Sequence, residues 1–165
     1  MAKSNGTSTS AKDAIEHLKV NEQKWTKALL AGGWTCAPNV VIERQQALGL
    51  TPLDINILLH LWTYWWTPDN KPHPSKATIA KAIGIKPRSV QRRIAAMEAA
   101  GFISRHERRQ KGKASKTNLY SFEGLIQHAT PYAQEKVQER KANRAAKAAT
   151  LKRKKPKLKL VPKDT

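Results

Sequence analysis

The chain has 165 residues, of which 31 are Lys or Arg and 12 are Asp or Glu, giving a formal net charge of +19. This length fits one domain with extensions, and the charge favours a polyanionic partner, with nucleic acid ahead of an anionic membrane surface. The sequence has no apolar run long enough to span a bilayer and no apolar core of a signal peptide, so we expect a cytoplasmic protein.

An amphipathic helix is predicted near the N-terminus, after residues 1–9, which are small and polar and which we expect to be disordered. Ser10 and Asp13 resemble a capping box, so the helix begins there and runs to about Ala31 before two glycines. We therefore assign residues 10–33 to an N-terminal helix. Its apolar stripe has two interpretations: it covers the core of the following domain, or it pairs with its copy in a homodimer. The stripe consists of Ile15, Leu18, Trp25 and Leu29.

Residues 34–49 are expected to form an irregular or strand-like piece, with the apolar residues 40–42 at its centre. A stronger signal follows at Thr51. Its hydroxyl, the proline directly after it and the carboxylate of Asp54 are together typical of a helix start. We expect this helix to run to about Trp66.

The predicted helix from Thr51 to Trp66 is apolar on two sides, and such a helix is usually buried on both. One stripe should form core, and it consists of Ile55, Leu58, Leu59, Trp62 and Trp66. The other should meet the N-terminal helix or another subunit, and it consists of Ile57, Leu61, Tyr64 and Trp65. Leu61 and Trp65 are thus an alternative homodimer contact. Stacking of single-stranded bases on the tryptophans is a competing interpretation, but their interleaving with aliphatic residues favours core packing.

Residues 74–103 predict two short helices joined by a tight turn. Ser75 is a good N-cap for the first helix, and Gly84 can adopt the φ > 0 conformation that ends it. Pro87 suits the first turn of the second helix, which Gly101 ends. Apolar residues at three- and four-residue spacing form the inner faces, and they are Ile79, Ala80 and Ile83 in the first helix and Val90, Ile94 and Met97 in the second.

The opposite face of the second helix is polar and basic, and its size fits the major groove of B-DNA. Arg can donate two hydrogen bonds to guanine and Gln can pair with adenine, so the predicted base-reading residues are Arg88, Gln91 and Arg92. Neighbouring cations and helix N-termini suit phosphate, so the predicted DNA-backbone contacts are Ser75, Lys76, Lys86, Ser89 and Arg93. The alternative interpretation is a helical hairpin whose arginines are merely solvated.

Two short strands are predicted after the helix pair, over residues 102–105 and 118–122, with a basic loop between them. The motifs of this region are Gly33-Trp34-x-x-x-Pro38-Asn39, Leu50-Thr51-Pro52, Pro74-Ser75-x-x-x-Ile79-Ala80-x-x-Ile83-Gly84, Ser89-Val90-x-x-x-Ile94 and Glu98-x-x-Gly101-Phe102-Ile103. With these motifs the chain resembles the winged helix-turn-helix family of bacterial, phage and plasmid regulators and replication proteins.

The resemblance implies a mainly α fold with a small β-hairpin wing, placed over residues 34–128, and double-stranded DNA as the partner. It also implies that the wing contacts the DNA backbone or the minor groove through Arg108, Arg109, Lys111, Lys113 and Lys116. If the family is bacterial, the protein is expected to associate with the nucleoid.

Residues 129–165 form a basic tail that we expect to be partly helical or disordered when free, because like charges at this density repel. Its predicted DNA contacts are Lys152, Arg153, Lys154, Lys155 and Lys157.

The sequence gives no sign of catalytic chemistry. Its five histidines and Cys36 lack metal-ligand spacing, and it has no phosphate-cradling glycine loop. We therefore expect no enzyme activity, no metal and no cofactor. The resemblance favours a sequence-specific transcriptional regulator of a phage, plasmid or other mobile element. A replication-initiation or partition factor that binds iterated origin sites and a low-specificity architectural protein are the alternatives.

Overall fold

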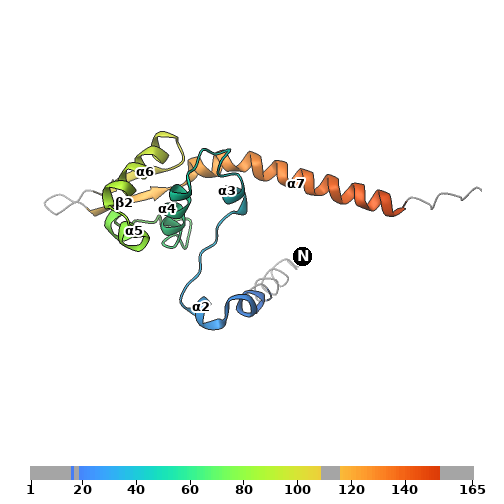
Figure 1. Cartoon of the computed structure of the whole chain (residues 1–165), viewed down its shortest axis with the longest axis horizontal. Helices are drawn as coiled ribbons and strands as arrows, with labels where there is room; N and C mark the ends of the chain where they lie inside the picture. Colours follow the sequence, from blue (N-terminus) through green and yellow to red (C-terminus); the bar gives the residue numbers. More distant parts are fainter. Residues whose placement is uncertain (1–15, 17–18, 109–115, 153–165) are drawn as a thin grey trace, which may run out of the picture.

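Helix α4, Pro52–Trp62, lies at the centre of the fold (Figure 1). The computed structural model describes residue 16 and residues 19–108 and 116–152. The predicted start of α4 is confirmed, because Thr51 Oγ1 accepts a hydrogen bond from the Asp54 amide at 3.3 Å. The Asp54 carboxylate in turn accepts one from the Thr51 amide at 2.8 Å, which completes a capping box.

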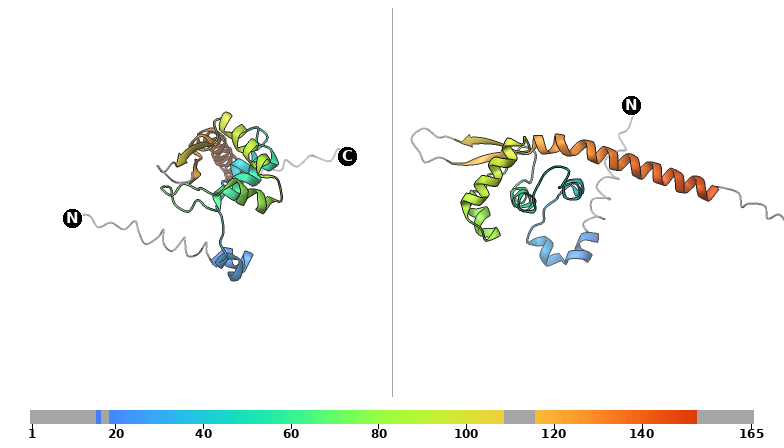
Figure 2. Two further views of the ribbon diagram at one scale, coloured as in Figure 1. Left: turned by 90° about the vertical axis from the view of Figure 1, so that its left-hand side faces the viewer. Right: turned by 45° about the horizontal axis from the view of Figure 1, so that its top comes forward.

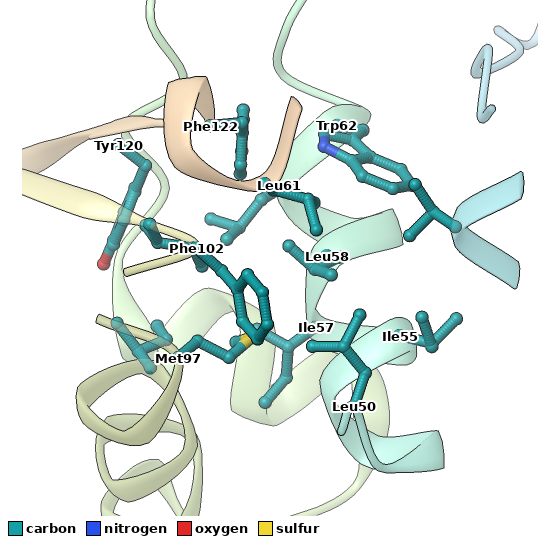
Figure 3. Packing of buried hydrophobic residues seen from close by; sticks show 14 of the residues in the cluster. Leu50, Ile55, Ile57, Leu58, Leu61, Trp62, Met97, Phe102, Tyr120 and Phe122 are labelled. Atoms are coloured by element: carbon teal, nitrogen blue, oxygen red, sulfur yellow. The ribbon is translucent and has the colours of Figure 1, made fainter. Parts of the chain in front are cut away.

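Buried residues of both predicted apolar stripes of α4 lie in the same core (Figure 3), whereas Tyr64 is 45% exposed. Ile57, Leu58 and Leu61 are completely buried. Leu61 therefore has no surface to offer another subunit, and its part in the predicted dimer contact is wrong. Trp65 is partly exposed and packs on Phe122, with 5.1 Å between ring centroids.

Helix α4 ends at Trp62 rather than at Trp66. The Thr63 hydroxyl donates a hydrogen bond to the His60 carbonyl at 2.8 Å, and the proline at position 68 disfavours helical backbone just before it. Trp66 lies beyond the helix end and is 63% exposed, so its predicted place in the core is wrong.

The predicted strand-like piece before α4 is helical: α3 spans Asn39–Glu43. Pro38 precedes it in an extended conformation, and Val41 is buried. No strand in the described part of the chain lies beside α3, and α3 packs on helix α7 instead. This packing outweighs the β preference of the valines and isoleucine, as tertiary contacts often do.

The N-terminal helix is broken where the sequence predicts continuity. Residues 19–25 are helical, Thr26 adopts φ 70° and ψ 149°, and the short helix α2, Lys27–Ala31, follows. Trp25 and Leu29 are 52% and 63% exposed, so they do not cover the core and that interpretation is wrong for these two residues. Ile15 and Leu18 lie outside the described residues. The extended chain before α3 leads this segment away from the core (Figure 1).

The predicted helix pair and hairpin are confirmed. Helix α5 spans Lys76–Ile83 and helix α6 spans Pro87–Ala99. Strand β1, Ser104–Arg108, pairs antiparallel with β2, Lys116–Ser121, with Arg105 opposite Tyr120. Strand β1 begins two residues after its predicted start, because the apolar pair at 102–103 is buried before it, and β2 begins two residues before its predicted start.

Helix α7, Glu123–Lys152, follows β2 directly and carries the chain away from the domain (Figure 2). Its first turns belong to the core: Leu125 and Ala129 are buried. The predicted boundary between residues 128 and 129 therefore falls inside a continuous helix.

Candidate DNA interface

Helix α6 presents a polar face to solvent because its other face is fixed in the core. Val90 and Ile94 are at most 1% exposed and Met97 is 2% exposed. The predicted base-reading residues lie on the opposite side, and all three are exposed: Arg88, Gln91 and Arg92. The structure thus brings these three side chains together on one helix face.

The turn between α5 and α6 depends on Gly84, which adopts the left-handed conformation at φ 80°. The Gly84 and Ile85 amides both donate to the Ala80 carbonyl, at 2.9 and 3.0 Å. Ala80 is buried, and its small side chain lets the two helices approach closely. This packing sets the angle at which α6 leaves the body of the domain.

The start of α5 contacts the exposed face of α6. Lys76 Nζ donates a hydrogen bond to Gln91 Oε1 at 3.1 Å. Ser75 caps α5, its Oγ accepting from the Thr78 amide at 2.9 Å. The predicted phosphate-contacting residues Ser75 and Lys76 therefore lie beside the predicted base-reading residue Gln91.

The start of α6 carries no acidic residue in its first turn. In the described part of the chain, its N-cap, Lys86, makes no side-chain capping bond. A helix N-terminus carries partial positive charge, so Lys86 and Arg88 there are unfavourable without an anion. This arrangement suits a phosphate group.

Arg93 is occupied inside the protein. Its Nε donates to Asp54 Oδ1 at 2.7 Å and its Nη2 pairs with Oδ2 of the same carboxylate. Asp54 is 1% exposed, whereas the Arg93 side chain is 28% exposed. Arg93, predicted to contact phosphate, uses its Nε and Nη2 donors inside the protein, and its guanidinium fixes α6 to the start of α4.

Burial alone would raise the pKa of Asp54, but hydrogen bonds from Arg93 and Thr51 outweigh burial and lower it below its ordinary value. The ion pair was not predictable from local pattern, since its partners are 39 positions apart. The helix-capping role of Asp54 already explained this residue, so its pairing with Arg93 was not predicted.

A second ion pair joins the end of α6 to the hairpin. Arg105 Nε donates to Glu98 Oε2 at 2.7 Å, and the Arg105 amide donates to Glu98 Oε1 at 3.3 Å. These hydrogen bonds lower the pKa of Glu98. The pair is about one-third exposed, so it fixes the hairpin less firmly than Asp54 fixes α6.

The hairpin extends beyond α6, but only part of its predicted DNA-contacting set is described. Arg108 donates from Nε to the Thr117 carbonyl at 3.0 Å and from Nη2 to the Thr117 hydroxyl at 3.1 Å. Two of the Arg108 guanidinium donors are thus engaged by Thr117 of the opposite strand. Arg109, Lys111 and Lys113 lie outside the described residues, as does the side chain of Lys116.

The face of α7 that packs on α3 becomes a basic, exposed face further along the helix. Lys136 pairs with Glu43 of α3, and one and two turns further on Arg140 and Arg144 are exposed on the same side, followed by Lys147. The tail was expected to be partly helical or disordered, and its described part is helical through Lys152. The side chain of Lys152 and the whole of Arg153, Lys154, Lys155 and Lys157 lie outside the described residues. No helix in the described ranges is long and apolar enough to cross a membrane.

Part of the chain is similar to known proteins. Residues 48–103 match the helix-turn-helix domain family. The N-terminal domain of DnaD protein from Geobacillus kaustophilus HTA426 has a similar fold, with a TM-score of 0.51 and 16% identity over 72% of this chain and 96% of that chain. A possible transcriptional regulator from Methanosarcina mazei Go1 aligns with a TM-score of 0.40 and 17% identity, covering 70% of this chain and 88% of that one. No curated protein matches the sequence significantly.

The family match and the hairpin that follows it identify this part of the chain as a winged helix-turn-helix domain. The helix-turn-helix match over residues 48–103 supports DNA binding by this part of the chain.

Proposed function

We propose that the protein binds double-stranded DNA sequence-specifically and regulates transcription, on a phage, plasmid or other mobile element of a bacterium. The observation that carries the proposal is the exposed face of α6, where Arg88, Gln91 and Arg92 stand together above a buried face. Arg and Gln are the side chains that read guanine and adenine in the major groove. The mobile-element setting rests on the family resemblance, and nucleoid association follows from DNA binding.

The roles within the interface divide by position. Lys86 and Ser89 at the start of α6, with Ser75 and Lys76 at the start of α5, are proposed to contact phosphates. The wing residues Arg109, Lys111 and Lys113, with Lys116, are proposed to contact backbone or the minor groove. Arg108 joins them only through the guanidinium donors that Thr117 leaves free. The exposed stripe of α7 and the tail beyond it add further backbone contacts.

Selection of bound fragments from a genomic library at about 150 mM salt tests the proposal, because phosphate-only binding weakens at that salt concentration. The full chain should enrich a discrete motif. One or a few sites near promoters support regulation, tandem repeats support replication initiation or partition, and the absence of any motif supports an architectural role.

Variants of the full chain test the division of roles. Arg88→Ala or Arg92→Ala should cost about 1–3 kcal/mol on the selected motif and relax specificity there. Lys113→Ala should weaken binding to all DNA similarly. Lys19→Ala is a matched control, since it removes one exposed cation far from α6 in the chain. Equal losses on motif and random DNA for Arg88→Ala and Arg92→Ala would contradict their base-reading role.

A further inference from the structure

An apolar groove opens at the end of the domain away from α5 and α6. It has a volume of about 430 Å³ and lies between the start of α3, the end of α4 and the first turns of α7. Its lining includes Ala37, Val40, Trp65, Phe122 and Ile126. Ile126 is 52% exposed, so part of this surface meets water in the single chain. Exposed apolar surface of this kind marks interaction sites more often than chance.

The same chain exposes a second apolar surface on residues 19–31, here called the N-terminal segment. Val20, Trp25 and Leu29 in this segment are 55%, 52% and 63% exposed. Large apolar side chains that are more than half exposed carry a solvation cost that a partner can remove. The segment and the groove are thus two partly exposed apolar surfaces among the described residues.

The chain between the two surfaces is short. Ala31 ends α2 and Ala37 already lines the groove. The connecting residues also lie beside their own segment, since Trp25, Leu30 and Trp34 share a hollow with Cys36 and Ala37. For the segment to fill its own groove, the chain would have to leave this arrangement. A second copy can fill the groove with the connection as it is.

We propose that two copies of the chain exchange N-terminal segments, each segment docking in the apolar groove of the other. Such an exchange is reciprocal about a two-fold axis and closes, so it gives a dimer and not a filament. One dimer covers both segments and both grooves. The proposal does not rest on the proposed function, because only apolar surfaces outside the DNA interface carry it.

The net charge gives the exchange a recognisable salt dependence. Two chains of formal charge +19 repel each other, and salt screens that repulsion while leaving apolar contacts intact. Association through the groove should therefore strengthen as salt rises from about 0.1 to 1 M. A dimer held by surface ion pairs would weaken over the same range.

Sedimentation of the full chain without DNA measures the dimer. Trp25→Ser with Leu29→Ser, or Ile126→Glu alone, should each weaken dimerisation at least about tenfold, because each removes apolar contact at one side of the interface. All three side chains are exposed in the monomer, so the variants should keep its thermal stability. Lys81→Ser on α5 is the matched control. Unchanged dimerisation in Ile126→Glu would overturn the proposal in favour of segments that pair with each other.

The single cysteine allows a direct test of exchange. Cys36 is exposed and lines the groove. A chain with Leu29→Cys and Cys36→Ser, mixed with the unmodified chain and oxidised, should form a covalent heterodimer. Lys81→Cys with Cys36→Ser should not. A chain that stays monomeric at every salt concentration and gives no cross-link would overturn the proposal, whether the groove is filled by its own segment or by a foreign protein.

Discussion

The two ends of the winged-helix domain expose opposite chemistry on one core. At one end, α5, α6 and the hairpin present free cations, and the arginines that face inward are held by carboxylates. At the other end, α3 and the first turns of α7 present an apolar groove. Helix α4 contacts α5 and α6 and lies between them and α3 (Figure 2). The difference shows how one small domain can keep a polyanion and an apolar partner on separate surfaces.

The joint between the two ends is the most sensitive position we identify. A Cβ at Gly124 would lie 1.7 Å from the Gly101 carbonyl oxygen, and the neighbouring Leu125 amide donates to the Phe102 carbonyl at 2.9 Å. Gly124→Ala should therefore destabilise the domain by about 3 kcal/mol or more, because backbone must move. Chemical denaturation measures this.

Gly84→Ala is the comparison for that variant. No atom lies within 4 Å of a Cβ there, so only the left-handed backbone conformation opposes the substitution, at about 1 kcal/mol. Equal losses for the two variants would mean that the α7 joint relaxes freely and that the two ends are weakly coupled.

The ion pair with the buried carboxylate, Asp54–Arg93, should matter more than the Glu98–Arg105 pair, which is about one-third exposed. Asp54→Asn leaves the Arg93 charge without its partner and should cost about 2–3 kcal/mol of unfolding free energy, less than a fully buried pair because Arg93 is partly exposed. Glu98→Gln should cost about 1 kcal/mol or less, since both partners of that pair are about one-third exposed. Thermal and urea unfolding of both variants check the order, and a larger loss for Glu98→Gln contradicts it.

Acid should break the ion pair between Asp54 and Arg93. The folded-state pKa of Asp54 lies below its ordinary value of 3.8, so its ionised form contributes stability at pH values above 3.8. That contribution is lost as the pH falls from 3.8 through the lower folded-state pKa. Unfolding free energies measured from pH 6 to about 2 should fall more steeply in the unmodified protein than in Asp54→Asn. Parallel curves would show that the pair adds no stability.

The smallest expected effect concerns the basic side of α7. Each phosphate contact adds roughly −0.9 to the slope of log affinity against log salt, so Arg140→Ala with Arg144→Ala should reduce the slope by up to about 1.8. Val137→Ala, on the same part of α7, is the uncharged control, and its slope should not change. An unchanged slope in the arginine variant would confine the DNA surface to α5, α6 and the hairpin.

Predictability from sequence follows the same division between the two ends. The helix pair, its turn at Gly84 and the cap at Thr51 were predicted because each depends on neighbouring residues. The hairpin was predicted within two residues. The exposed positions of Arg88, Gln91 and Arg92 followed from the helical period alone.

The apolar end was predicted poorly because long-range packing decides it. The β-branched run before Glu43 suggested a strand, yet it forms a helix against α7, a contact between segments far apart in the chain. The engagement of Arg93 depends on a carboxylate 39 positions away. The break at Thr26 has no local signal either, since a β-branched residue rarely adopts positive φ.

The continuity of α7 changes what its cations can do. A disordered tail would place its cations at variable positions, whereas a helix that starts in the core places them along one direction. Its 30 residues span about 45 Å at 1.5 Å per residue, or about 13 base pairs of B-DNA. Any charge on α7 is therefore held at a set distance and direction from α6. Helix α7 can therefore favour contact with phosphates at one fixed distance from the base pairs that α6 contacts.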